Sequence, residues 1–174
     1  SDVRWAVLDT ASNAQSWKIT EVSGGSVNPG TGSVTTLIAA ANACIGKNLA
    51  QCAKYFGVSN PNCEWCAWFV RQCGIKANMN FGTSNIASQV RGVNGNVSFS
   101  ATTPKVGDLA LIDTHGGSSV GHVGIITAIT GNNITTVEGN MSGSVTTSIV
   151  KNAFYDASGY SSTFGRIVYI GKNS

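Results

Sequence analysis

Five cysteines lie close together in the chain: Cys44, Cys52, Cys63, Cys66 and Cys73. An odd number of cysteines in an oxidising compartment indicates two disulfides and one free thiol, and a thiol kept free is a candidate nucleophile. Cys66 suits this chemistry best, because it falls in the first turn of a predicted apolar helix. There the positive end of the helix dipole favours the thiolate form. Five reduced, buried cysteines in a cytosolic protein would fit the same count.

A thiol of ordinary pKa needs a base beside it at neutral pH, and the chain offers two histidines. His122 lies within a predicted strand, between glycines that would let a substrate backbone approach. His115 lies in a Gly/Ser-rich loop and is more typical of a surface or groove residue. A third group must hold the imidazole through its other nitrogen. Glu138, which ends the next strand of the same hairpin, is the first candidate, and Asn140 is the second.

The spacing Cys63-x-x-Cys66 also occurs in redox and zinc sites. A thioredoxin-like redox site follows a buried strand in a βαβ unit, whereas this pair follows a predicted helix and a turn. A zinc site requires a second such pair or paired histidines, and the sequence has neither. We therefore expect neither a metal nor a cofactor. Asp108, which follows a Pro-x-x-Gly turn, is expected to bind that turn rather than to catalyse.

The elements that must position these residues are predicted from the pattern of apolar residues. Helical periodicity predicts helices over 33–45, 49–56 and 64–73; the third is apolar almost all round and should be buried. Gly74 is expected to end that third helix. The pattern after residue 107 predicts strands over 108–112, 121–130, 133–138, 145–150 and 166–170. A chain that forms helices first and strands second predicts an α+β domain with an antiparallel sheet.

Composition and charge limit the kind of protein. Residues 1–32 are interpreted as an N-terminal extension with a Gly/Ser-rich linker, and residues 33–174 as one domain. The formal net charge is +3, with no cluster of Lys and Arg, so we do not expect a nucleic-acid partner. Mild positive charge would favour approach to an anionic polymer. No apolar run reaches the roughly 20 residues that span a bilayer, and no signal peptide opens the chain, which is therefore cytoplasmic or a mature form.

Four short motifs share their order with a known family. They lie at 65–70, 104–112, 121–125 and 138–140. The first resembles the nucleophile helix of the CHAP and NlpC-type cysteine peptidases, and the second is similar to their "PxxGDLxxF" strand. The third resembles their histidine strand, and the fourth resembles the "EGN" that closes the CHAP-type site. The resemblance implies a papain-like (CHAP/NlpC) core as the catalytic domain at 33–174, no metal, and peptidoglycan as the usual substrate.

The resemblance leaves two candidates for the nucleophile. Many CHAP sequences have Gln-Cys-Thr-Trp, and residues 62–65 can be aligned there, which would make Cys63 the nucleophile. Cys66 is preferred, because the Phe-Val and Gly-Ile pairs that follow it then match the family. A Trp stands before Cys66 in place of the family's usual Gln. The expected oxyanion donor is therefore the backbone N–H of Cys66 itself.

The resemblance implies a cysteine endopeptidase that cleaves amide bonds in the stem peptides of peptidoglycan or muropeptides. The family also includes N-acetylmuramoyl-L-alanine amidases, and the same thiol–imidazole pair would serve a papain-like acyltransferase or transglutaminase. A wall-binding module without activity is the non-enzymatic alternative. We expect a monomer that is secreted to the extracellular space or cell wall. A delivered toxin would act in the periplasm and would need an immunity protein.

Helix geometry restricts the possible disulfides. A helix over 64–73 would separate Cys63 from Cys73 by about 15 Å of rise, whereas a disulfide requires Cα atoms within about 7 Å. The preferred pairs are Cys52–Cys63 and Cys44–Cys73, which would join the three helices around a free Cys66.

Overall fold

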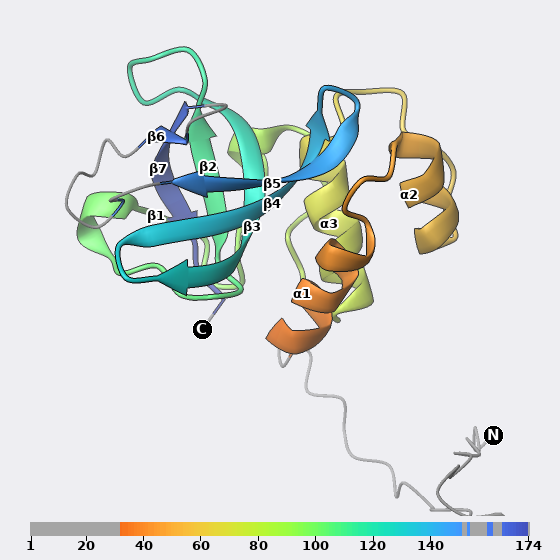
Figure 1. The fold of residues 1–174 in the computed structure, drawn as a ribbon, viewed down its shortest axis with the longest axis horizontal. Coiled ribbons are helices and arrows are strands. Elements are labelled where there is room, and N and C mark those ends of the chain that lie inside the picture. The colour runs from red at the N-terminus through yellow and green to blue at the C-terminus, as the bar shows by residue number, and fades with distance from the viewer. Residues whose placement is uncertain (1–31, 151–152, 154–159, 162–164, 174) are drawn as a thin grey trace, which may run out of the picture.

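The computed structural model describes residues 32–150, 153, 160–161 and 165–173. Nearly all of the predicted N-terminal extension lies outside these residues, so the boundary predicted after residue 32 stays a prediction. Within the described residues, three α-helices precede a seven-stranded antiparallel sheet, which confirms the predicted α+β class. Figure 1 shows the helices gathered on one side of a strongly curved sheet.

Local side-chain chemistry sets the limits of the first two helices. The helices are α1 (Val34–Ala43), α2 (Leu49–Phe56) and α3 (Cys66–Lys76). Ser33 caps α1, because its hydroxyl accepts a hydrogen bond from the N–H of Thr36 at 3.1 Å. Asn48 and Gln51 form a capping box at the start of α2, and Gly57 ends that helix with a left-handed φ of 71°. None of the described helices is long and apolar enough to cross a membrane.

Helix α3 differs from the other two at both ends. Its N-cap residue is Trp65, whose side chain makes no capping hydrogen bond, so the first N–H groups of the helix are open to other acceptors. The prediction that Gly74 ends the helix is wrong, because α3 continues to Lys76. Gly74 instead allows Phe81 to approach closely: a Cβ at this position would lie 2.5 Å from the phenyl ring.

The strands form one sheet that closes on itself. They are β1 (Asn96–Ser98), β2 (Leu109–Asp113), β3 (Val120–Thr130), β4 (Asn133–Met141), β5 (Ser144–Val150), β6 (Tyr160–Ser161) and β7 (Gly165–Gly171). Their order is β1-β7-β2-β3-β4-β5-β6, and β6 also pairs with β7, so the sheet forms a small barrel. The predicted hairpin between β3 and β4 is confirmed, since Thr130 pairs with Asn133 across its turn.

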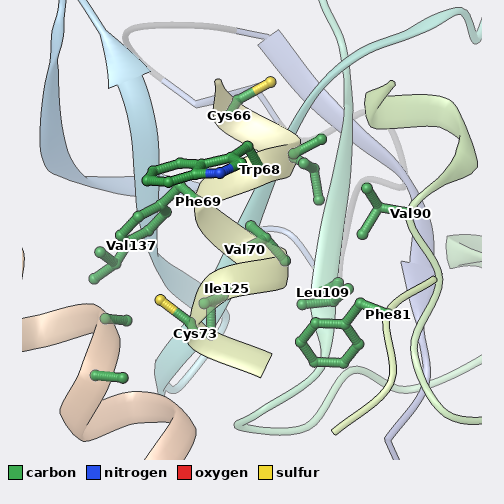
Figure 2. Packing of buried hydrophobic residues seen from close by; sticks show 14 of the residues in the cluster. Cys66, Trp68, Phe69, Val70, Cys73, Phe81, Val90, Leu109, Ile125 and Val137 are labelled. Atoms are coloured by element: carbon green, nitrogen blue, oxygen red, sulfur yellow. The ribbon is translucent and has the colours of Figure 1, made fainter. Parts of the chain in front are cut away.

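Two clusters of buried side chains lie on opposite faces of this sheet. We call the first the helix-side core; it includes Phe69, Val70, Leu109, Val123, Ile125 and Val137. We call the second the barrel core; it includes Ala110, Ile112, Ile126, Ile134, Ile167 and Ile170. Figure 2 shows α3 running through the helix-side core with apolar side chains around it. The third helix is therefore central and buried, as its apolar circumference predicts.

Candidate active site

Cys66 is the first residue of α3 and only 6% exposed. Burial raises the pKa of its thiol, and this effect outweighs the hydrogen bonds from the backbone N–H groups of Ala67 and Val123, which lower it. The thiol is therefore protonated at neutral pH. The thiolate that the helix dipole led us to expect is not the resting form, because the apolar surroundings oppose it.

The donor from Val123 links the sulfur to strand β3, since Val123 directly follows His122 in that strand. His122 is 2% exposed, and burial lowers the pKa of its imidazole to about 4. At neutral pH the ring is therefore uncharged and able to accept a proton. Its Nε2 atom lies 4.0 Å from Oε1 of Glu138 on the neighbouring strand β4.

Glu138 is fully buried, and its two carboxylate oxygens face different partners. Oε2 accepts a hydrogen bond of 2.6 Å from the hydroxyl of Ser148 on β5, while Oε1 is the oxygen directed at His122. Burial raises the pKa of the carboxyl, and the hydrogen bond from Ser148 lowers it in part. The carboxylate is thus fixed at one oxygen and available to the imidazole at the other.

The glycines beside His122 admit groups of the protein itself. A Cβ at Gly124 would lie 2.6 Å from Cγ of Glu138, and a Cβ at Gly121 would lie 2.0 Å from the hydroxyl of Thr114. The sequence alone predicts that these glycines leave room for a substrate backbone. In the structure, Gly124 makes the room in which Glu138 reaches towards the imidazole.

Asn140 connects the end of β4 to the segment that leads into α3. Its side-chain amide donates a hydrogen bond to Oε2 of Glu64, two residues before Cys66. Its backbone has a left-handed φ of 59°, a conformation that asparagine tolerates better than most residues. Glu64 was not among the predicted site residues, and its only signal in the sequence is its position just before the nucleophile candidate.

The four predicted residues therefore gather where the start of α3 meets β3 and β4. His122 and Glu138 are side by side, and the sulfur of Cys66 bonds to the backbone of the residue after His122. Asn140 is tied to the approach to Cys66 through Glu64. Such an arrangement combines a neutral thiol, a neutral imidazole, a buried carboxylate and backbone donors, which are the components of nucleophilic acyl transfer.

The residues that were weighed against this set lie elsewhere. Cys63 is exposed, outside the helix. His115 is exposed, and its Nδ1 lies 2.7 Å from the hydroxyl of Thr114. Asp108 binds its turn as predicted, because it accepts a hydrogen bond of 2.8 Å from the N–H of Lys105.

Asp113 is a residue of the site region that sequence reasoning missed. It is 4% exposed at the end of β2, and its carboxylate accepts hydrogen bonds from the N–H groups of His115, Gly116 and Ser118 at 3.0, 2.6 and 3.0 Å. Nε of Arg166 lies 3.5 Å from Oδ2 of the same carboxylate. Asp113 therefore shapes the loop that leads into the histidine strand. An aspartate just before a Gly/Ser-rich loop could have been predicted to accept hydrogen bonds from the backbone of that loop.

All five cysteines are free thiols, so neither predicted disulfide is present in the structure. The thiol of Cys44 is hydrogen-bonded to that of Cys52, whereas the prediction paired Cys44 with Cys73. The other predicted partner, Cys63, is exposed while Cys52 is completely buried. In the part of the chain that the structure describes, no group of three or more His, Cys, Asp or Glu side chains is arranged to hold a metal ion.

Comparison with known proteins identifies the family. The model of the CHAP domain matches residues 48–140, which is more than half of the chain and includes Cys66, His122, Glu138 and Asn140. The chain therefore belongs to the CHAP domain family, as the motifs predicted.

Two solved structures are similar to the chain. One is the crystal structure of Ly7917, with 21% identity, a TM-score of 0.47, and coverage of 81% of this chain and 63% of that chain. The other is the crystal structure of Ly7917 with the hydrolyzing product of MDP, with 20% identity, a TM-score of 0.47, and coverage of 82% and 64%. The chain thus spans less than two thirds of the length of these structures. No curated protein matches the chain.

Proposed function

We propose that the protein is a peptidoglycan hydrolase, and specifically a cysteine endopeptidase that cleaves amide bonds of the stem peptide. Membership of the CHAP family supports a hydrolase with this substrate class. The observation that carries the finer proposal is the convergence of Cys66, His122 and Glu138 at one end of α3. We propose also that the enzyme acts in the cell wall, where that substrate lies.

The first step is proton transfer coupled to attack. Because the pKa of Cys66 is raised and that of His122 is lowered to about 4, the resting pair is a neutral thiol and a neutral imidazole. The sulfur attacks the scissile carbonyl carbon while the imidazole takes the thiol proton as general base. Since Nε2 faces Glu138, the nitrogen that accepts this proton is Nδ1.

Glu138 stabilises the imidazolium that forms in this step. Its Oε1 lies 4.0 Å from Nε2, and its other oxygen is held by Ser148, so the negative charge is kept in place on the far side of the ring. A carboxylate in a buried position interacts strongly with a charge that appears next to it. The imidazolium then gives its proton to the leaving amine, and a thioester on Cys66 remains.

The uncapped N-terminus of α3 would stabilise the oxyanion that forms on the substrate carbonyl during the attack. The backbone N–H groups of Cys66 and Ala67 belong to the first turn, where no side chain caps the helix, and the donor from Ala67 is already directed at the sulfur. Such donors stabilise negative charge on the carbonyl oxygen without needing to reorganise. Water, deprotonated by His122, then hydrolyses the thioester and releases a carboxylic acid.

Digestion of purified sacculi, followed by mass spectrometry of the muropeptides, tests this proposal. We expect the wild-type protein to release fragments with a new amine and a new carboxyl group within the stem peptide. Cys66→Ala should release none, and the matched control Cys63→Ser should give the wild-type pattern. Release of intact stem peptides from muramic acid would identify an amidase instead. Amine incorporation without new fragments would identify an acyltransferase, and equal activity of wild type and Cys66→Ala would contradict the mechanism.

A further inference from the structure

Three thiols that the proposed mechanism does not use lie together at the other end of α3. Cys44 is the C-cap of α1, Cys52 is in α2, and Cys73 is in the last part of α3. Each is 0% exposed, and all three belong to the helix-side core. Figure 2 shows Cys73 at the opposite end of α3 from Cys66.

Within this cluster, Cys44 and Cys52 are the pair in contact. Their thiols are hydrogen-bonded to each other, and this contact shifts the pKa of Cys44 more than the nearby Cys73 does. The chain leaves Cys44 in a tight turn, in which the N–H of Lys47 donates to the carbonyl of Cys44 at 2.9 Å, and then enters α2 at Leu49. The thiol of Cys52 lies 3.9 Å from the carbonyl oxygen of Lys47, on the inside of the same turn.

We propose that Cys44 and Cys52 are a redox pair, which closes to a disulfide when the folded protein meets a small-molecule disulfide, while Cys63, Cys66 and Cys73 form no disulfide with another cysteine of the chain. This pair differs from both pairings predicted from the sequence. It would join the end of α1 to α2 across the turn, on the side of the helices away from the candidate active site. The inference concerns a second site and does not depend on the proposed hydrolysis.

A route for the oxidant exists beside the pair. A cavity of about 590 Å³ is lined by Ile45, Gly46, Lys47, Gln51, Lys54 and Tyr55. Two of these residues, Ile45 and Gln51, directly adjoin one of the two cysteines in the chain, and four of the six lie in the segment between the cysteines. The cavity is lined by residues of the turn that joins the two cysteines, so we infer that a local opening of this turn would let a small disulfide reach the sulfurs.

The reaction balances as a thiol–disulfide exchange. The hydrogen bond from Cys44, with help from the ammonium group of Lys47, lowers the pKa of Cys52, whereas that same contact and burial raise the pKa of Cys44. Cys52 therefore loses its proton first and attacks one sulfur of the small disulfide, which releases one thiol. The sulfur of Cys44 then displaces the second thiol from Cys52. The two thiol protons end on the two released small thiols, so the protein is oxidised by two electrons and the small disulfide is reduced.

Tryptic mapping distinguishes the proposed pair from the other pairings, because a Lys or Arg separates Cys44, Cys52, Cys73 and the Cys63/Cys66 segment from one another. Cleavage yields 19–47 with Cys44, 48–54 with Cys52, 55–71 with Cys63 and Cys66, and 72–76 with Cys73. The folded protein is incubated with oxidised glutathione, remaining thiols are alkylated in denaturant at low pH, and the digest is analysed without reductant. We expect 19–47 joined to 48–54, two hydrogens lighter than the sum of the two peptides. A link from 48–54 to 55–71, a link from 19–47 to 72–76, or complete alkylation of all five cysteines would overturn the proposal.

Thermal unfolding gives a second, independent readout. We expect the oxidised wild type to melt about 5 °C above the reduced protein, because a disulfide restricts the unfolded chain. Cys63→Ser should show the same rise, whereas Cys52→Ala and Cys44→Ala should show none. A rise that persists in Cys52→Ala would contradict the pair. If the substituted proteins do not fold, the wild-type map alone decides.

Discussion

Helix α3 carries a cysteine near each end, and the two thiols have different surroundings (Figure 2). Cys66 lies against backbone N–H donors from Ala67 and Val123, beside strand β3, which carries the imidazole of His122. Cys73 lies among apolar side chains and two other thiols. Burial raises the pKa of both.

The difference between the two ends therefore does not lie in a lowered pKa at the candidate nucleophile. It lies in the groups around the sulfur of Cys66. These are backbone N–H donors, which can stabilise a developing negative charge, and the neutral imidazole on strand β3. The neighbouring donors and base would therefore make Cys66 reactive. Cys73, at the apolar end of the same helix, is suited to packing or to pairing with another thiol.

The largest expected effect comes from removing each thiol in turn. Cys66→Ala should lower kcat/KM by at least about 10³-fold, because no nucleophile remains. Cys73→Ala should keep activity within a few-fold and instead lower the free energy of unfolding by about 1 to 2 kcal/mol, the cost of a small cavity in the core. Muropeptide release and urea unfolding measure the two quantities. A folded but inactive Cys73→Ala protein would contradict the distinction between a catalytic thiol at Cys66 and a packing thiol at Cys73.

The sequence predicted which of these side chains lie together better than it predicted their pKa values. The types and order of Cys66, His122 and Glu138 were sufficient to predict that their side chains lie near one another. The start of a helix and a β-hairpin each place side chains in known directions. The raised pKa of Cys66 was not predicted. It depends on how completely the surrounding core excludes water, which no local pattern reports.

The fold was predicted where periodicity is strong and missed where segments are short. Helices and the long strands lie within a few residues of their predicted positions. Strands β1 and β6 were missed, because three and two residues are too few to show alternation. Gly74 was misread as a helix end, since its role depends on Phe81, which approaches from a later part of the chain.

The second prediction concerns the carboxylate that faces the imidazole. Glu138→Gln should lower kcat/KM by about 10²-fold, because the neutral amide cannot stabilise the imidazolium although its volume is the same. Ser148→Ala, which leaves the carboxylate but removes its 2.6 Å hydrogen bond, should have a smaller effect of a few-fold. Equal losses in both variants would show that Glu138 acts through packing with Ser148 and not through its charge.

The third prediction follows from the lowered pKa of His122. An imidazole with a pKa of about 4 is still mostly neutral at pH 5, whereas one with the ordinary value of 6.5 is mostly protonated. At pH 5 the enzyme should therefore keep about 30-fold more of its kcat/KM than an ordinary histidine base would allow. A pH profile of kcat/KM measures this, and an acid limb near pH 6.5 would contradict it.

The same shift has a consequence for stability. Because the pKa of His122 is lower in the folded than in the unfolded protein, the unfolded state takes up the proton first. The contribution of His122 to the free energy of unfolding should fall as the pH drops from 6.5 towards 4. Glu138 acts in the opposite sense, because burial raises its pKa and the folded state then binds its proton first. The denaturation of Glu138→Gln against pH separates the two contributions.

The smallest expected effect lies at the link between β4 and the start of α3. Asn140→Ala removes the amide that bonds to Glu64 and places an alanine at a φ of 59°, so kcat/KM should fall by about three- to tenfold. Asn140→Gly loses the same amide without the backbone strain, so the difference between the two variants isolates the strain.

The charge of Glu64 contributes to the raised pKa of Cys66. Glu64→Gln should therefore speed alkylation of Cys66 by iodoacetamide about two- to threefold at pH 8, since more thiolate is present. Unchanged alkylation in that variant would mean that Glu64 positions Asn140 without acting on the sulfur, and the influence of β4 on the cysteine end of α3 would then be mechanical and not electrostatic.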